Sequence, residues 1–331
     1  MNKTKYPPET AGRRMIEQVP LAFPEETILD VKKRLFKEIE KLETINYVYV
    51  IREDKKLIGV FSIKEIFRKP ERTKIKDIMT KNLITARPYT DQERIAILAL
   101  RNNLKAIPVV DKEGKFLGVV PSDIILDILH FEHVEDFLQL GGFPKIDTLP
   151  ENLLKTPPTT LAKARLPWLI FGIFGETLGA QIIHLLEGSL KIYFALAAFI
   201  PLILYTSGAV STQTLALTIR NLTFDSKISI KKYLLKEIKI GFLLASILGL
   251  LLSLISGFLY HQPYFVGFIL GVSLFLAVVC AISIGFLIPW TLQKLKKDPA
   301  IGSGPFMAVI SDLTSLVIYF LVIKLLLQFF I

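Results

Sequence analysis

The chain has 331 residues, 51% of them hydrophobic, and a formal net charge of +10 at pH 7. Residues 1–165 hold 24 of the 30 acidic residues and 29 of the 40 Lys and Arg residues, and the rest consists of long apolar runs. We therefore expect a water-soluble domain followed by a membrane domain. The bases flank the apolar runs and do not alternate with aromatic residues, so no nucleic-acid partner is expected. The single cysteine, Cys280, excludes an internal disulfide and a metal cluster of cysteine ligands.

The first half contains an internal repeat. The segments VYVIREDKKLIGVFSIKEIF (residues 48–67) and IPVVDKEGKFLGVVPSDIIL (residues 107–126) share the order strand, charged turn, short strand and helix. Each follows a predicted helix, over residues 28–42 and 91–102. Two such β-α-β-β-α units resemble a tandem cystathionine β-synthase (CBS) pair. The resemblance implies a tail over residues 1–13 and α+β repeats over residues 14–72 and 73–130.

CBS pairs often hold an adenine nucleotide between the repeats, using a Ser or Thr and an Asp three residues later. The first copy offers Ser62 and Glu65 at these places, but the second has Pro121 and Ile124. The carboxylate that would bind the ribose is therefore missing from the second copy. We therefore expect a dimerising regulatory module with an empty cleft, and adenine-nucleotide binding is the alternative.

An acidic stretch follows the second repeat, where residues 130–140 continue a helix that Gly141 and Gly142 end. Like charges four residues apart repel on a helix unless a cation lies between them. Hard cations prefer oxygen ligands, so the stretch is a candidate regulatory cation cluster; a solvated helix face is the alternative. We place a connecting, plug-like helix and linker over residues 131–165. The candidate cluster consists of Asp123, Asp127, Glu132, Glu135 and Asp136.

Five apolar runs in the second half are long enough to cross a bilayer. We place them at residues 166–186, 190–217, 238–259, 265–290 and 301–330, which gives an all-α membrane domain over residues 166–331. The first 40 residues lack the apolar core of a secretory signal, so the amino-terminal domain is expected in the cytoplasm. Lys and Arg gather before the first span and in the loops after the second and fourth. This charge pattern predicts a multi-pass protein of the plasma membrane with its carboxyl terminus outside.

Asp312 is the only acidic residue after Asp298 and lies about eleven residues into the last span, close to the bilayer midplane. A charge at that depth costs at least roughly 3 kcal/mol, so it needs a cation or water. Ser311, Thr314 and Ser315 surround it and are expected to line a wet path. Asp312 is therefore the leading candidate for a functional residue.

The combination resembles the MgtE family of magnesium channels and transporters. The resemblance is carried by the CBS pair, the five spans, and the segments RLPWL, FIPLILYTSGAVSTQTLALTIRNL and DPAIGSGPFMAVISDLTSLVIYF. It implies a homodimer that encloses one pore between the second and fifth spans. It also implies that Asp312 binds hydrated Mg²⁺, with Ala308 one turn earlier. The family's helical amino-terminal domain has no counterpart in the first dozen residues.

Two departures from the family bear on selectivity. Gly304 stands where the family typically has Asn. Gly208, Ala209 and Thr212 stand where the family has a Gly-Gly-Asn run with a second Asn, and only Gly208 and Gln213 survive there. Gly304 lacks the oxygen acceptor of an Asn side chain and leaves space in the ring around Asp312. We therefore expect weaker discrimination between Mg²⁺, Mn²⁺ and Ca²⁺. These departures place the ion preference in question and leave the architecture intact.

Glu176 is a second acid at membrane depth, about ten residues into the first span. It is either an additional pore ligand or a carboxyl group kept protonated by burial. No enzyme constellation and no ATPase motif is present, so transport would run down the electrochemical gradient. The alternatives are a cation exchanger coupled to Na⁺ or H⁺, and a CBS-bearing membrane sensor or scaffold that transports nothing.

Overall fold

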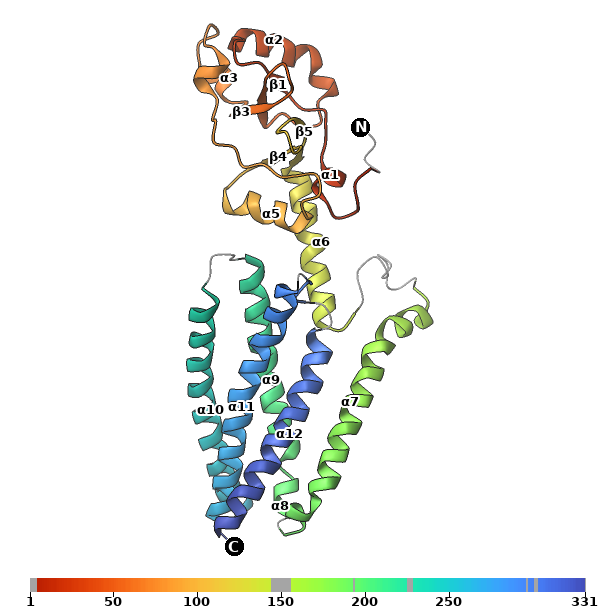
Figure 1. Ribbon diagram of the computed structural model, residues 1–331, viewed down its shortest axis with the longest axis vertical. Helices are drawn as coiled ribbons and strands as arrows, with labels where there is room; N and C mark the ends of the chain where they lie inside the picture. The colour runs from red at the N-terminus through yellow and green to blue at the C-terminus, as the bar shows by residue number, and fades with distance from the viewer. Residues whose placement is uncertain are drawn as a thin grey trace. The chain divides into compact units, whose positions relative to one another are not determined.

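The computed structural model describes residues 5–143, 156–192, 194–224, 229–295, 297–300 and 303–330 (Figure 1). Its internal contacts divide the chain into two compact units, Met1–His133 and Val134–Ile331. The first is α+β and the second is helical.

The first repeat folds as a small sheet with a helix on it. Strand β2 (Tyr47–Ile51) lies in the centre, paired in parallel with β1 (Leu21–Ala22) and antiparallel with β3 (Leu57–Ser62). Helix α2 (Ile28–Glu38) starts at a capping box, in which the Thr27 side chain accepts from the Asp30 amide and the Asp30 carboxylate accepts from the Thr27 amide. A 3₁₀ turn, η2 (Ile39–Lys41), extends α2, and α3 (Glu65–Arg68) follows β3.

The second repeat has the same order. After α4 (Ile75–Ile78) come α5 (Gln92–Arg101), the antiparallel pair β4 (Ala106–Val110) and β5 (Phe116–Pro121), and α6 (Ser122–Leu140). The predicted helix over residues 91–102 agrees with α5 within one residue at each end. The helix predicted over residues 28–42 is four residues longer than α2, because the chain tightens into the 3₁₀ turn η2 after Glu38.

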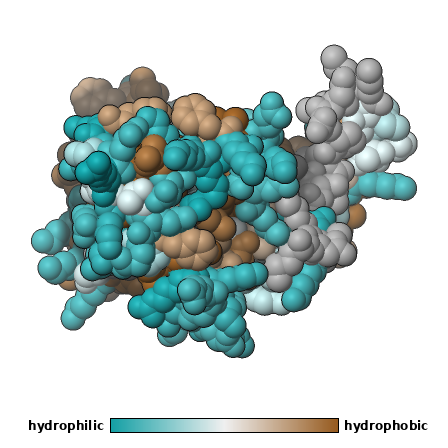
Figure 2. Space-filling model, turned by 90° about the horizontal axis from the view of Figure 1, so that it is seen from above, coloured by the Kyte–Doolittle hydropathy of each residue, from teal (hydrophilic) through white to brown (hydrophobic). Residues whose placement is uncertain are grey.

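The two repeats share a core with the amino-terminal segment that carries α1 (Ala11–Arg14). Ile16 bridges to Val119 of β5, and both are buried together with Tyr49 of β2. The Tyr49 ring stacks on Phe116, with 5.2 Å between the ring centroids. One buried cluster therefore spans both repeats. Figure 2 shows a face of the molecule that is mostly hydrophilic, as expected for a domain in water.

The second unit contains five helices long and apolar enough to cross a membrane, among the residues that the structure describes, as the sequence predicts. The five are α7 (Pro158–Ile192), α9 (Ile200–Phe224), α10 (Ile230–Tyr260), α11 (Tyr264–Lys294) and α12 (Ser303–Phe330). A single turn, α8 (Phe194–Ala197), precedes α9. Helix α11 is the centre of the unit and packs against α9, α10 and α12, whereas α7 packs mainly against α12.

The second span begins later than predicted. Helix α9 starts at Ile200, not near residue 190, because the chain first makes the short turn α8. Pro201 is therefore in the first turn of α9, where a proline removes no helical hydrogen bond. The apolar run itself continues through both helices, which is why hydropathy alone placed the boundary too early.

Candidate cation site

Asp312 lies where three membrane helices meet. It projects from α12 toward α9, since a Cβ atom on Gly208 of α9 would lie 3.8 Å from Asp312 Oδ1. The carboxyl group of Glu176, on α7, lies within hydrogen-bonding reach of the Asp312 carboxyl group. The two acids that the sequence placed at a similar membrane depth are thus brought into direct contact.

The close approach of α7 and α12 explains this contact. Gly175 of α7 is buried against Val309, and a Cβ atom at this glycine would lie 2.2 Å from Val309 Cγ1. Any larger residue at position 175 would push the two helices apart. The neighbouring Glu176 is exposed on α7 and reaches Asp312 across this seam, whereas Asp312 is half-buried.

Two carboxyl groups in contact cannot both carry a bare charge at low cost. Like charges at this separation repel strongly where water is scarce, and a proton or a cation held between them removes the repulsion. Oxygen ligands of this type suit hard cations such as Mg²⁺ and Ca²⁺. Glu176 and Asp312 together therefore form a pair that is chemically suited to hold a cation.

The serines beside Asp312 are buried between helices and do not line an open path. Ser311 and Ser315 are buried between α12 and α9, and Ser315 Oγ donates to Ser207 Oγ at 2.7 Å. The Thr314 hydroxyl donates to the carbonyl of Ile310 in its own helix. Ser311 Oγ is buried without a hydrogen-bond partner among the described residues. The two serines lie in a helix–helix seam and the Thr314 hydroxyl bonds within its own helix, so the predicted wet path along these hydroxyls is wrong for this structure.

The exposed side of the same helices carries Ala308, one turn before Asp312 on α12. On α9 the exposed side carries Thr212 and Gln213, and Thr212 Oγ1 donates to the Gly208 carbonyl oxygen at 2.9 Å. Small and polar side chains are thus exposed at the level of the carboxyl pair, between long apolar stretches. Such a face is costly in lipid and suits a protein interface or a water-filled path.

Gly304 contacts the end of the helix that comes from the repeats. A Cβ atom at Gly304 would lie 1.9 Å from the carbonyl oxygen of Leu140, the last residue of α6. The Leu140 side chain packs on a buried cluster formed by Leu215, Ile219, Ala300 and Met307. The expectation that Gly304 leaves spare room is therefore wrong in this conformation, because the α6 backbone occupies the space. This contact gave no signal in the sequence.

The acidic stretch on α6 is divided between opposite sides of the helix. At 100° per residue, Glu132 lies 180° around the helix from Asp123 and Asp136 lies 180° from Asp127, so these two pairs face opposite ways, whereas Glu135 lies 80° from Asp127. Glu132 accepts from Gln92 Nε2 at 2.6 Å, and the buried Glu135 accepts from Gln139 Nε2 at 2.9 Å. No three His, Cys, Asp or Glu side chains of the described ranges group into a metal site.

A cavity of about 260 Å³ lies in the cleft between the two CBS repeats. Tyr49 is buried there, its hydroxyl has no hydrogen-bond partner among the described residues, and burial raises its pKa. Ser62 lines this cavity but no basic side chain does, although a phosphate would require one. The lining residues are Tyr47, Tyr49, Val60, Phe61, Ser62, Thr80, Asn82, Leu83, Ile84, Leu104, Ala106 and Pro108.

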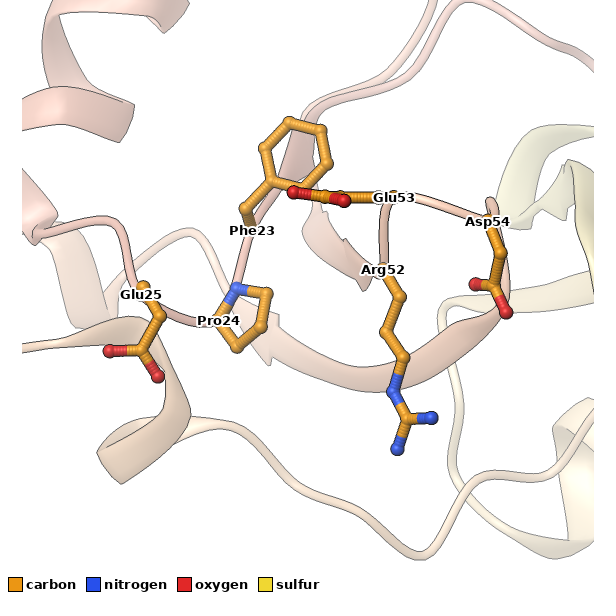
Figure 3. A pocket seen from close by; sticks show the side chains of 6 residues that line it. All are labelled: Phe23, Pro24, Glu25, Arg52, Glu53 and Asp54. Atoms are coloured by element: carbon orange, nitrogen blue, oxygen red, sulfur yellow. The ribbon is translucent and has the colours of Figure 1, made fainter.

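A second, open pocket of about 590 Å³ lies on the first repeat (Figure 3). It lies between the loop after β1, with Phe23 and Glu25, and the β2–β3 turn, with Arg52, Glu53 and Asp54. The Glu25 carboxylate is already engaged, since hydrogen bonds from Lys76 and Lys74 lower its pKa to about 2. This pocket holds no pair of side chains that would perform chemistry together.

Comparison with known proteins agrees with this architecture. A family described as "Divalent cation transporter" matches residues 200–322, and the CBS domain matches residues 11–72 and 75–130. The "Magnesium transporter MgtE" of Bacillus subtilis (strain 168) is 34% identical over 317 residues, covering 95% of this chain and 69% of that protein. The protein of the same name from Thermus thermophilus is 34% identical over 329 residues, covering 98% and 71%.

Solved structures give a partial match. The cytosolic domain of the Mg²⁺ channel MgtE in complex with ATP is 32% identical, with a TM-score of 0.38, over 38% of this chain and 51% of that one. The assignment to a family rests instead on the sequence relatives, which match nearly the whole chain. The chain belongs to the MgtE family of divalent cation transporters and is a CBS-bearing membrane transporter, not an enzyme.

Proposed function

We propose that two copies of this chain form a homodimer that conducts divalent cations, Mg²⁺ foremost, through a path lined by α9 and α12. The observation that carries the proposal is the contact between Glu176 and Asp312 at membrane depth. Next to it, the exposed Thr212 and Gln213, with the small Ala308, make a face that is costly to expose to lipid. A second copy of the same face would enclose that polar surface.

The ion passes down its electrochemical gradient. Mg²⁺ gives up its inner waters reluctantly, so a carboxylate that binds the hydrated ion serves better than a cage that strips it. The membrane potential contributes about 2.3 kcal/mol per charge per 100 mV, and twice that for a divalent ion. No further energy source is required for uptake into a negative interior.

Orientation follows from the basic end of α10. Lys231, Lys232, Lys236 and Lys239 are exposed within its first ten residues, and such clusters mark the cytoplasmic side. With α10 starting inside, the CBS repeats lie in the cytoplasm and the end of α12 lies outside. The protein is then a multi-pass protein of the plasma membrane.

Purified protein in liposomes tests the transport proposal. We expect Mg²⁺ influx that follows an imposed negative potential and does not change when Na⁺ or pH gradients are imposed. Dependence on either gradient would instead support the cation exchanger, with Glu176 and Asp312 as the coupled pair. Absence of divalent flux under all gradients would favour a membrane sensor or scaffold.

We propose that one of the two carboxylate pairs on α6 is a regulatory cation site, and that internal Mg²⁺ bound there holds the end of α6 against Gly304 and the Leu215–Met307 cluster, which closes the path and inhibits influx. Repelling carboxylates lose their penalty when a cation binds, so Mg²⁺ bound only to the folded state raises stability by mass action. The full-length protein in detergent should melt at a higher temperature in millimolar Mg²⁺ than in chelator. Because they lie on opposite sides of α6, D123N/D127N and E132Q/D136N serve as controls for each other, and only one pair should abolish the shift. A melting temperature that does not change with Mg²⁺ would contradict this site.

The cleft between the repeats is a second place for a regulatory ligand. Its orphaned Tyr49 hydroxyl favours a ligand with a polar edge, and the absence of lining bases disfavours the phosphates of an adenine nucleotide. We keep the expectation that an adenine nucleotide does not bind. Calorimetric titration of ATP and of adenosine into the full chain separates a nucleotide site from a site for the neutral base.

A further inference from the structure

Glu237 is a buried carboxylate that the proposed cation path does not use. It is the eighth residue of α10 and is only 5% exposed. A buried carboxylate is costly unless it is paired or hydrogen-bonded. Among the described residues Glu237 has no ion-pair partner, and its contact is the hydroxyl of Tyr233, one turn earlier.

The Tyr233 hydroxyl is the centre of a small polar cluster. It lies 3.4 Å from Thr218 Oγ1 and within hydrogen-bonding reach of Asn221, both on α9, and of Glu237. A phenol has one proton to donate and accepts through its oxygen. The carboxylate is the strongest acceptor present, so Tyr233 donates to Glu237 and accepts from the α9 side chains. The ring is fixed on Phe286 of α11, with 5.8 Å between centroids.

This cluster directly links two helices that otherwise have few contacts. Both α9 and α10 pack mainly on α11, and α9 also packs on α12. The link lies at the carboxyl end of α9, on the turn that also carries Ile219. Ile219 and Leu215 form part of the buried cluster on which Leu140 of α6 packs. One turn of α9 is thus held by α10 on one side and supports the end of α6 on another.

We infer that Glu237 is a positioning residue: it orients Tyr233 to clamp the cytoplasmic end of α9, and so maintains the surface on which α6 closes the cation path. The inference rests on the proposed transport function. Loss of the clamp loosens the end of α9, weakens the packing of Leu140 and makes closure less complete. Asp312 lies elsewhere and keeps its contacts, so conduction itself is retained.

Two measurements on the full-length protein test the clamp. Amide hydrogen exchange over residues 215–222 should become about tenfold faster in Y233F and E237A, the effect of one lost charge-assisted hydrogen bond. Exchange near the start of α9 should not change. In liposomes, the internal Mg²⁺ concentration that half-inhibits influx should rise about threefold, while maximal influx is retained. A change in half-inhibition at constant maximal influx separates positioning from general loss of structure.

Further variants test whether Tyr233 and Glu237 act through one interaction. The double variant Y233F/E237A should equal Y233F in exchange over residues 215–222, because E237A acts only by orienting the hydroxyl that Y233F removes. E237Q keeps an acceptor oxygen and should stay close to the native protein. Y260F removes a phenol hydroxyl from the exposed far end of the same helix and should change nothing.

Three results would overturn the clamp: unchanged exchange in Y233F, additive effects in the double variant, or an E237Q variant as defective as E237A. The last result would give Glu237 a role through its charge. If the native protein passes no divalent cation, the proposed function fails, and hydrogen exchange still decides the clamp.

Discussion

Replacing Asp312 by Asn should reduce divalent-cation influx by at least ~100-fold while the protein remains folded and inserted. The exchange preserves the size of the side chain and removes the charge that attracts the ion and faces Gly208. It also relieves the repulsion between the contacting carboxyl groups of Asp312 and Glu176, so stability should not fall. Influx of Mg²⁺ into liposomes at matched protein density, followed with an internal dye, measures the effect.

Three further variants make this result specific. D312E retains the charge and should recover part of the influx. E176Q should lower influx less than D312N, because Glu176 is exposed and Asp312 projects from the proposed path-lining helix. D298N changes the acid that caps the Ala300 amide before α12 and should leave influx nearly unchanged. Native influx in D312N would remove Asp312 from the path and with it the basis of the proposed function.

Local features of the sequence were sufficient to predict most of the elements. The five membrane helices follow from apolar runs, and the repeated strand–turn–strand–helix order gives the two CBS units. The end of α6 was also predictable: Gly141 and Gly142 terminate it, and Gly142 has the positive φ of +76° typical of such ends. Each of these signals depends on residues that are neighbours in the chain.

The contacts at the candidate site could not be predicted in this way. Glu176 and Asp312 are far apart in sequence, and only the packing of α7 on α12 at Gly175 brings them together. The serines next to Asp312 appeared to line a path because the sequence does not show which side of α12 meets α9. Periodicity cannot settle this for a helix that is apolar on most sides.

The separation of the α6 carboxylates follows from the sequence alone, although these residues are close together in the chain. Nine residues along a helix place Glu132 opposite Asp123, and simple helical geometry separates the two groups. The buried Glu237, by contrast, resembles a cytoplasmic flanking charge in the sequence, and only its burial against Tyr233 shows another role.

Substituting Gly304 should have the second largest effect on Mg²⁺ influx, because it should prevent the end of α6 from closing the cation path. Alanine is the better helix former by about 1 kcal/mol, so G304A would stabilise α12 if its Cβ atom had space. That space is taken by the Leu140 carbonyl oxygen, which is backbone and cannot rotate away. The end of α6 must therefore leave its position. We expect G304A to raise Mg²⁺ influx at high internal Mg²⁺ severalfold, and G304N to raise it at least as much.

The control for this prediction is G257A, since a Cβ atom at Gly257 meets nothing within 4 Å. It should leave influx and its inhibition by internal Mg²⁺ unchanged. L140A should reproduce the effect of G304A from the other side of the contact, because it empties the cluster around Met307. Competition by Ca²⁺ and Mn²⁺ in G304N then tests selectivity independently: if Gly304 governs only closure, the ratios among the three ions stay constant while total influx rises. A G304A variant that is inhibited normally would show that α6 leaves this position without opening the path, and closure would then lie elsewhere along α9 and α12.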